Sequence, residues 1–176
     1  MSKQICSVCE SELSEGYRSW HFLCDRCGYE KTNLKSTINL HSTHQLIDEN
    51  SRETGLKELR LSNFTKILTI IKSLKPNGGR LLEVGCADGW FLEIAKNDFE
   101  VLGLEADKNV FDAVYRRELP VSMGFFPDVP DESEKFDVIV FNDVIEHIPD
   151  IERILGSCHQ RLNKEGLLVL TLPSSN

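Results

Sequence analysis

The stretch Arg80–Phe91 carries an acidic residue and two glycines at a spacing that suits a small charged ligand. Its first residues are apolar and typical of a buried parallel strand, and the apolar residues after the second glycine recur at helical spacing. Gly85 and Gly89 allow a tight turn that brings the backbone close to a ligand. The unpaired N–H groups at a helix start suit an anion, whereas Glu83 at the strand end would repel a phosphate and attract an ammonium group.

A second acidic residue follows the next apolar run, Val101–Leu104. Glu105 lies twenty positions after Gly85, and an acid at that offset can accept hydrogen bonds from ribose hydroxyls. The dinucleotide fingerprint G-x-G-x-x-G is absent, which disfavours an NAD-linked oxidoreductase. One acid for an amine, loop amides for a carboxylate and a second acid for a ribose together describe an amino acid joined to a nucleoside.

At these residues the chain resembles the class I S-adenosylmethionine-dependent methyltransferases, whose first motif is an acid, any residue, and three glycines at alternate positions. Ala87 replaces the middle glycine, which fits if its backbone φ is negative and costs stability if φ is positive. The resemblance covers about residues 52–173 and implies an α/β fold, a doubly wound, mostly parallel Rossmann-like sheet that binds S-adenosylmethionine. The cofactor-binding residues that we expect on this basis are Glu83, Gly85, Cys86, Ala87, Gly89, Glu105, Ala106, Phe125, Phe126 and Asn142.

Two adjacent aromatic residues, Phe125 and Phe126, lie in the acidic loop that spans 124–135. In the methyltransferase family, the loop after the third strand often packs on the adenine. The resemblance therefore implies that one of the two rings contacts the base. The alternative is that both rings simply pack under the loop.

Polar residues cluster at the carboxyl end of the fourth predicted strand. Ligands of open α/β sheets bind beyond the carboxyl ends of strands, so this cluster should face the glycine turn. The resemblance implies that Asn142 helps to fix the methionine amine, and His147 is the candidate catalytic residue, a general base near the methyl acceptor. Asp143, Glu146 and His147 could instead hold a divalent metal, as proposed for a similar stretch in ubiquinone-biosynthesis O-methyltransferases, or Glu146 and His147 could merely orient the loop.

The first four of six cysteines form two C-x2-C pairs separated by fourteen residues. In a reducing compartment this spacing favours a metal over disulfides. Four thiolates predict a closed, tetrahedral, structural zinc site, and a unit as small as residues 1–35 needs that metal to fold. The predicted ligands are Cys6, Cys9, Cys24 and Cys27.

The aromatic residues between the two cysteine pairs predict a β-ribbon. In that ribbon Trp20 and Phe22 share one face, and His21 is exposed. Residues 36–51 are rich in Ser, Thr and Asn and predict a linker to the domain at 52–176. The linker's histidines are predicted to be solvated rather than to bind metal: His41 and His44.

The bulk composition is that of an ordinary globular protein, with 40% apolar and 27% charged residues. A formal charge of −8 makes nucleic acid an unfavourable partner. We find no run of 18 apolar residues and no leader pattern, so we expect a cytoplasmic protein that does not enter the membrane.

The periodicity predicts the order of elements after the linker. Five strands and four helices are expected, but the family sheet has seven strands, so the last two are missing. The fifth strand would then expose an apolar edge at Leu167–Leu172, which is a pairing liability. We infer a truncated chain, or an edge covered by a second chain in a homodimer. The expected helices are at about 52–74, 89–97, 108–117 and 151–162, and the strands at about 81–84, 100–105, 120–123, 136–142 and 166–173.

The function expected from the resemblance is S-adenosylmethionine-dependent methyl transfer to a small-molecule acceptor, such as a sugar or another metabolite. The alternative is a cofactor-binding module or RNA methyltransferase whose zinc ribbon recruits a macromolecular partner. The acidic charge of the chain counts against the RNA version.

Overall fold

The computed structural model describes residues 4–34, 49–148 and 150–172. The chain divides into two compact units, Met1–Ser36 and Thr37–Asn176. The first unit is a three-stranded antiparallel sheet of β1 (Ser14–Glu15), β2 (His21–Leu23) and β3 (Glu30–Thr32), in that order. Among its described residues, 4–34, the buried hydrophobic cluster is formed by Cys6, Leu13 and Cys24, with Cys9, Phe22 and Tyr29 partly buried against it. This apolar area is too small to hold a fold by itself.

Two predictions for the ribbon are wrong. His21 is buried, because its ring packs over Gly16, where a Cβ would lie 2.0 Å from Nδ1, and against the ring of Tyr17. Its Nε2 lies 2.9 Å from a carboxylate oxygen of Glu30 on the neighbouring strand. Trp20 lies in the turn before β2 and so does not share a strand face with Phe22.

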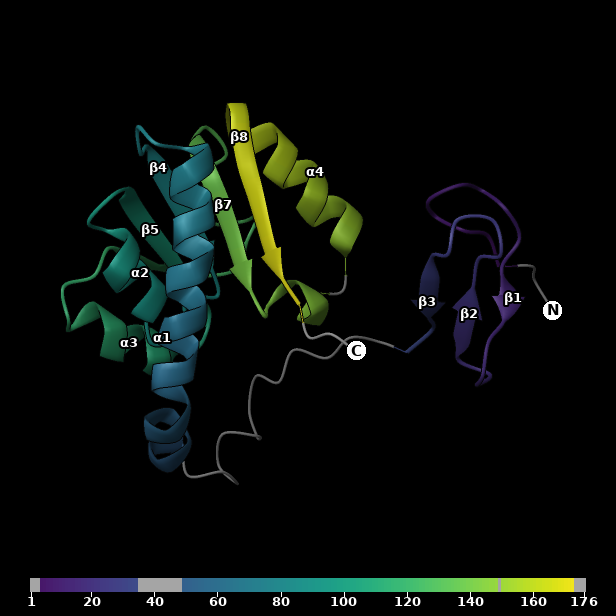
Figure 1. Ribbon diagram of the computed structural model, residues 1–176, viewed down its shortest axis with the longest axis horizontal. Helices are drawn as coiled ribbons and strands as arrows, with labels where there is room; N and C mark the ends of the chain where they lie inside the picture. Colours follow the sequence, from purple (N-terminus) through teal and green to yellow (C-terminus); the bar gives the residue numbers. More distant parts are fainter. Residues whose placement is uncertain (1–3, 35–48, 149, 173–176) are drawn as a thin grey trace. The chain divides into compact units, whose positions relative to one another are not determined.

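The second unit contains a five-stranded sheet in the order β6-β5-β4-β7-β8, and its neighbouring strands all pair in parallel (Figure 1). The prediction of a doubly wound α/β fold is therefore confirmed. The strands are β4 (Arg80–Val84), β5 (Glu100–Glu105), β6 (Val121–Met123), β7 (Phe136–Asn142) and β8 (Leu162–Thr171).

Helices cover both faces of this sheet, because successive strand residues point to opposite faces. On one face, Leu81 and Val138 pack with residues of the first two helices, and on the other, Leu82 and Ile139 pack with Ile154 of the last helix. The helical elements are α1 (Glu49–Leu74), α2 (Trp90–Ala95), α3 (Lys108–Tyr115), the short 3-10 helix η1 (Ile145–His147) and α4 (Ile151–Arg161).

The strand order reverses next to β4. The chain runs from β4 outward to β5 and β6, and then returns to place β7 on the other side of β4. The carboxyl ends of β4 and β7 therefore flank the switch point, where ligands bind in open α/β sheets. This reversal brings Glu83 and Asn142 together although they are 59 positions apart.

The last strand begins earlier than predicted. Leu162 was expected in the helix, but α4 ends at Arg161 and Leu162 already pairs with Phe136 of β7. The register then shifts before Val138 pairs with Leu167, and Glu165 takes a positive φ of 64° in the irregular stretch. Leu162 packs on the buried cluster beneath the sheet, which favours the earlier start.

Within the described residues, none of the helices has the length and apolar character needed to cross a membrane. The prediction for His41 and His44 concerns residues outside the described ranges.

Candidate functional site

The turn between β4 and α2 needs residues that tolerate left-handed backbone. Gly85 and Gly89 have φ values of 72° and 69°, and a Cβ at these positions would lie 2.7 Å from Val144 and 2.8 Å from Leu119. Ala87 also has a positive φ, of 44°. Of the two alternatives that the sequence left open, Ala87 therefore has the strained, positive-φ conformation. This backbone conformation costs of order 1 kcal/mol of stability.

An acidic residue is buried at the end of β4. Glu83 is only 2% exposed, and one carboxylate oxygen accepts a hydrogen bond of 2.9 Å from Nδ2 of Asn142. Its other oxygen, and Oδ1 of Asn142, are buried without a partner. Burial, opposed by the Asn142 bond and assisted by the charge of Glu105, raises the pKa of Glu83 to about 8. Two orphaned acceptors side by side fit a ligand that brings N–H donors and positive charge.

The acid at the end of β5 is bonded quite differently. Glu105 accepts hydrogen bonds from the amides of Ala87, at 2.9 Å, and of Ala106 and Asp107, at 2.9 and 2.8 Å. The bond from Ala87 ties the glycine turn to β5 and helps to hold the strained alanine. Each carboxylate oxygen has two lone pairs; Oε1 already accepts the bonds from Ala106 and Asp107, and Oε2 accepts the one from Ala87, so Oε2 can still accept one hydrogen bond from a ligand.

Two cavities meet at Gly85 and Val144, which line both. The smaller cavity has a volume of about 130 Å³ and the larger one about 490 Å³. The smaller is lined by Arg60, Phe64, Glu83, Gly85, Cys86, Ala87, Asp88, Trp90, Asn142, Asp143 and Val144. The larger is lined mainly by Val84, Leu104, Glu105, Ala106, Gly124, Phe125, Phe126, Val144, His147, Ile148 and Ile154.

The two phenylalanines of the 124–135 loop have different environments. Phe126 is 6% exposed, and its ring lies edge-on to Phe141 of β7 at 5.8 Å. Phe125 is 45% exposed and lines the larger cavity. Both rings border the cavity, but Phe126 belongs to the core of the domain, so Phe125 is the better candidate for a ligand contact.

The polar residues after β7 do not converge. Asn142 and Asp143 line the smaller cavity, whereas His147 lines the larger one and Glu146 lines neither. Among the residues that the structure describes, no acidic or histidine cluster meets the geometry of a metal site; the group that does is formed by cysteines. The geometry therefore gives no support to a metal at Asp143, Glu146 and His147.

A third cavity, of about 360 Å³, lies next to the smaller one. It shares Arg60, Phe64 and Asp143 with the smaller cavity, and Lys66 and Thr171 also line it. Asp143 has a positive φ of 55°, and Thr171 Oγ1 accepts a hydrogen bond of 3.1 Å from its amide. Sequence reasoning missed Arg60, because a single arginine on a long helix gives no signal of its own.

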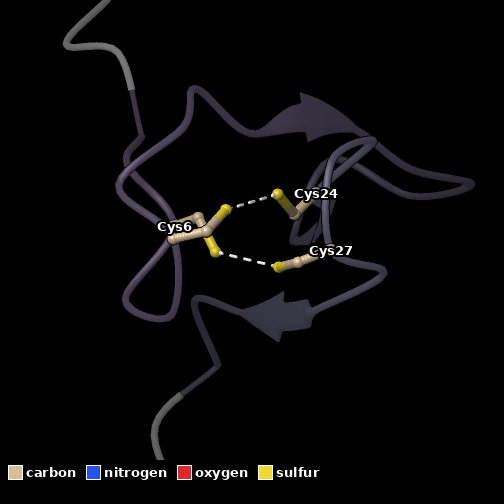
Figure 2. Close-up of side chains that lie close together, drawn as sticks. Cys6, Cys24 and Cys27 are labelled. Atoms are coloured by element: carbon tan, nitrogen blue, oxygen red, sulfur yellow. Dashed lines mark hydrogen bonds between the residues drawn. The ribbon is translucent and has the colours of Figure 1, made fainter.

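Cys6, Cys9, Cys24 and Cys27 converge, and their sulfur atoms all lie within 4.8 Å of one another. Figure 2 shows the side chains of Cys6, Cys24 and Cys27 pointing toward one another. The Cys6–Cys27 and Cys9–Cys24 sulfur pairs are 3.6 and 3.4 Å apart. Tetrahedral zinc with Zn–S bonds of about 2.3 Å requires sulfur separations of about 3.8 Å, so the four thiols fit this ion. Hydrogen bonds from the side chain and backbone of Ser11 lower the pKa of Cys9 to about 6. At Cys27, the backbone hydrogen bond at Tyr29 is outweighed by burial and the neighbouring thiols, which raise the pKa of this thiol.

The strand order and the cavities at the switch point define a class: Rossmann-like α/β domains that bind a nucleoside-containing ligand beyond the carboxyl ends of their strands. The sequence profile of the family described as "Methyltransferase domain" matches residues 55–176, and the chain belongs to that family.

Curated relatives share part of this domain. The chain is 37% identical over 98 residues to a ubiquinone biosynthesis O-methyltransferase of Paramagnetospirillum magneticum, covering 52% of this chain and 39% of that protein. It is 30% identical over 105 residues to the human mitochondrial ubiquinone biosynthesis O-methyltransferase, covering 53% and 28%. The chain therefore spans less than half the length of these two relatives.

A solved structure with a similar fold is the amino pentose methyltransferase of Micromonospora echinaspora with S-adenosylmethionine bound. Its TM-score is 0.62 at 20% identity, with 76% of this chain and 59% of that chain covered. A sugar N-methyltransferase from Streptoalloteichus gives a TM-score of 0.55 at 21% identity, covering 62% and 47%. At these identities the likeness establishes the fold.

Proposed function

We propose that the second unit binds S-adenosylmethionine and transfers its methyl group to a small-molecule acceptor. The observation that carries this proposal is the pair of buried, unpartnered acceptor atoms on Glu83 and Asn142 in a cavity beside Glu105. An ammonium group is the ligand that would satisfy both atoms and neutralise a buried carboxylate.

The smaller cavity would hold the methionine end of the cofactor. Glu83 and Asn142 would accept hydrogen bonds from its amine. The Ala87 amide already donates to Glu105, so it is less available for the carboxylate than the sequence suggested. Arg60 lines the same cavity and offers a guanidinium, the side chain best suited to a carboxylate.

The larger cavity would hold the nucleoside end. Oε2 of Glu105 would accept a hydrogen bond from a ribose hydroxyl, and the apolar walls, with Phe125 and Ala106 among the lining residues, would contact the adenine. Gly85 joins the two ends, and its missing side chain leaves the backbone close to the ligand.

Methyl transfer needs an acceptor lone pair in line with the methyl–sulfur bond, and the sulfur leaves with the bonding electrons. The protein contributes alignment and the exclusion of water. An O–H or N–H acceptor also needs a base. We retain His147 as the candidate base, although His147 lines the larger cavity. Asp143 is a second candidate, because Asp143 lines both the smaller and the third cavity.

We propose a sugar or another small metabolite as the acceptor. Its support is the third cavity, which has room for a small molecule and opens next to the proposed methionine site. The relatives and structural neighbours described above include a ubiquinone biosynthesis O-methyltransferase and an amino pentose methyltransferase.

The cofactor assignment is tested by calorimetric titration with S-adenosylhomocysteine and, separately, with NAD. We expect S-adenosylhomocysteine to bind with one site per chain and NAD to bind far more weakly. Binding of NAD without S-adenosylhomocysteine would overturn the assignment.

We propose structural zinc for the first unit, because four cysteine sulfurs leave no position open for catalysis. Elemental analysis should give one zinc per chain. Chelation should unfold the ribbon while S-adenosylhomocysteine binding persists, and a Cys6→Ala protein whose ribbon folds without metal would refute the site.

We also propose that β8 pairs with a second copy of the chain. β8 is the outer strand on its side of the described sheet, and Leu170 at its end is 40% exposed. A monomer in light scattering at high concentration would exclude this pairing.

A further inference from the structure

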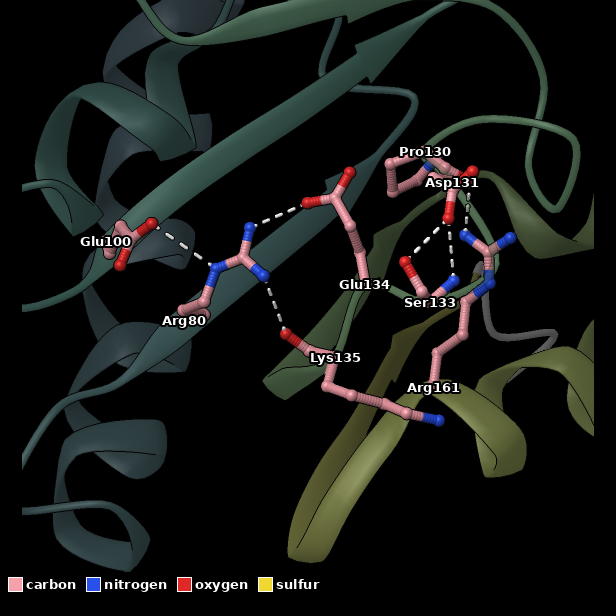
Figure 3. Close-up of polar contacts among 8 residues, drawn as sticks. All are labelled: Arg80, Glu100, Pro130, Asp131, Ser133, Glu134, Lys135 and Arg161. Atoms are coloured by element: carbon pink, nitrogen blue, oxygen red, sulfur yellow. Dashed lines mark hydrogen bonds and ion pairs between the residues drawn. The ribbon is translucent and has the colours of Figure 1, made fainter.

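A buried arginine lies behind the wall of the larger cavity. Arg161, the last residue of α4, is 3% exposed. One terminal nitrogen donates a hydrogen bond of 2.6 Å to the carbonyl oxygen of Pro127. The other donates a bond of 2.8 Å to the carbonyl oxygen of Pro130 (Figure 3). Its guanidinium carbon lies 5.2 Å from the centre of the Phe126 ring. One side chain thus holds three points of a single loop.

Burying a charge without a paired acid is unfavourable, so the contacts that Arg161 makes must offset the cost of its burial. Within the described part of the chain, Arg161 forms no ion pair. A nearby acid, Asp131, accepts hydrogen bonds from the side chain and backbone of Ser133 instead. The charge of Arg161 is therefore met by two carbonyl dipoles and an aromatic face, together with the charge of Asp131 nearby, and all of these belong to the loop.

The loop that Arg161 holds has no regular structure of its own. It joins β6 to β7 without a helix or strand among its described residues. Gly124, Phe125, Phe126 and Asp128 nevertheless form one wall of the larger cavity. The wall is also held by an exposed ion pair between Asp128 and Arg153, by the backbone bond from the Val129 amide to the Phe125 carbonyl, and by the bond from the Gly124 amide to the Glu105 carbonyl. An exposed ion pair contributes little, and the Gly124 bond holds only the start of the loop, so the buried arginine anchors its middle.

We propose that Arg161 is a positioning residue for the nucleoside half of the cofactor. Its guanidinium fixes the Pro127 and Pro130 carbonyls and the back of the Phe126 ring, and this sets the place of Phe125 at the mouth of the cavity. Arg161 itself does not line the cavity. The inference rests on the proposed function, because it assigns that cavity to the adenine and ribose.

A second arginine provides a matched control on the same loop. Arg80 donates to the Lys135 carbonyl at 3.1 Å and pairs with Glu134 at 2.8 Å and Glu100 at 3.3 Å (Figure 3). It therefore anchors the far end of the loop, at the start of β4 and away from the cavities. Arg80 is absent from the linings of all the described cavities.

The test compares Arg161→Met and Arg80→Met with the parent chain. Methionine keeps an apolar stem of similar length but cannot donate to the carbonyls. Calorimetric titration is carried out with adenosine and with S-adenosylhomocysteine, below the melting temperature of each variant. We expect Arg161→Met to weaken both ligands by the same factor, about tenfold or more, because the lost preorganisation concerns their shared nucleoside. Arg80→Met should change both affinities less than about twofold, although its melting temperature falls.

Arg161→Lys serves as the second variant, since it keeps the charge and much of the volume. A single ammonium at the end of a flexible stem does not reproduce the planar, two-way donation, so we expect the adenosine affinity to stay reduced. Hydrogen exchange at the Val129 amide, which bonds to the Phe125 carbonyl at 3.0 Å, should also quicken in both variants.

Unchanged affinities in folded Arg161→Met would overturn the inference, as would a loss of stability with no loss of affinity. Unfolding of both Arg161 variants would also overturn it, because Arg161 would then serve the fold as a whole. If the parent chain binds neither ligand, the proposed function fails instead, so the two failures are distinguishable.

Discussion

The two ends of the proposed cofactor cleft hold an acid in opposite ways. At the smaller cavity, Glu83 is buried with one hydrogen bond and an orphaned oxygen. At the larger cavity, Glu105 accepts hydrogen bonds from three backbone amides, which it would do with or without a ligand. Glu83 keeps an unpartnered oxygen that a ligand cation would satisfy. Glu105 is bonded by the backbone itself and would in addition bind the ligand.

Because of this difference, replacing Glu83 should affect ligand binding without loss of stability, whereas replacing Glu105 should affect both. Ionised Glu83 costs the unliganded protein free energy that a ligand ammonium recovers. Glu105 closes the glycine turn, so its loss should harm both the fold and the site. The following substitutions test this contrast, beginning with the largest expected effect on binding.

Glu83→Gln should weaken S-adenosylhomocysteine binding by about 100-fold, because the ammonium loses a buried opposite charge. The unliganded protein should be at least as stable as the parent, since a neutral amide replaces a buried carboxyl. Calorimetry and thermal unfolding measure the two quantities. Glu100→Gln is the control. Glu100 is the first residue of β5, at the opposite end of that strand from Glu105, and its side chain is 75% exposed. Equal affinity in Glu83→Gln and the parent would end the assignment of this cavity.

Glu105→Gln should weaken the same ligand by about 30-fold and also lower the melting temperature by several degrees. Three backbone amides donate to the two carboxylate oxygens of Glu105. Glutamine has only one acceptor oxygen, so its NH2 group would face at least one N–H donor. If Glu105→Gln lowers the affinity but leaves the melting temperature unchanged, the prediction is wrong, because Glu105 would then contribute to binding and not to the fold.

The pH dependence follows from the pKa of Glu83, which burial raises from 4.5 to about 8. The folded, unliganded protein holds this proton more tightly than the unfolded chain does. The resulting stabilisation is fully present below about pH 4.5 and is lost as pH rises through about 8. Affinity for S-adenosylhomocysteine should move the other way, rising by up to about tenfold per pH unit toward pH 8.

Titrations in buffers of different ionisation enthalpy should show proton release on binding near neutral pH. The dependence should disappear in Glu83→Gln. A pH-independent affinity in the parent chain would mean that Glu83 is already ionised without a ligand, contrary to its burial.

Phe125→Ala should have the smallest effect, a loss of about three- to tenfold in adenosine affinity, because one exposed ring contributes about 0.5–1.5 kcal/mol. Stability should change little. Tyr115→Ala is the control, since Tyr115 is also an exposed aromatic residue, at 62%, and lines no described cavity. A larger loss for Tyr115→Ala than for Phe125→Ala would contradict the placement of the base.

The sequence by itself determined much of this protein. The apolar runs separated by glycine turns fixed the parallel sheet, because strand and helix periods are local properties of the chain. The acids Glu83 and Glu105 were found from their offsets to Gly85, and the four cysteines from their C-x2-C spacing. These features could be predicted since each depends on residues close together in the sequence, or on a strand end whose place in the sheet follows from a simple rule.

The tertiary structure alone decided which groups remain unsatisfied and which are held. It separated Phe126, buried against Phe141, from Phe125 at the cavity, and it gave Ala87 a positive φ with its amide on Glu105. It also brought Arg60 to the cleft and Arg161 to the carbonyls of Pro127 and Pro130. These outcomes depend on contacts between residues far apart in the chain, where packing and burial, rather than local spacing, set the free energy.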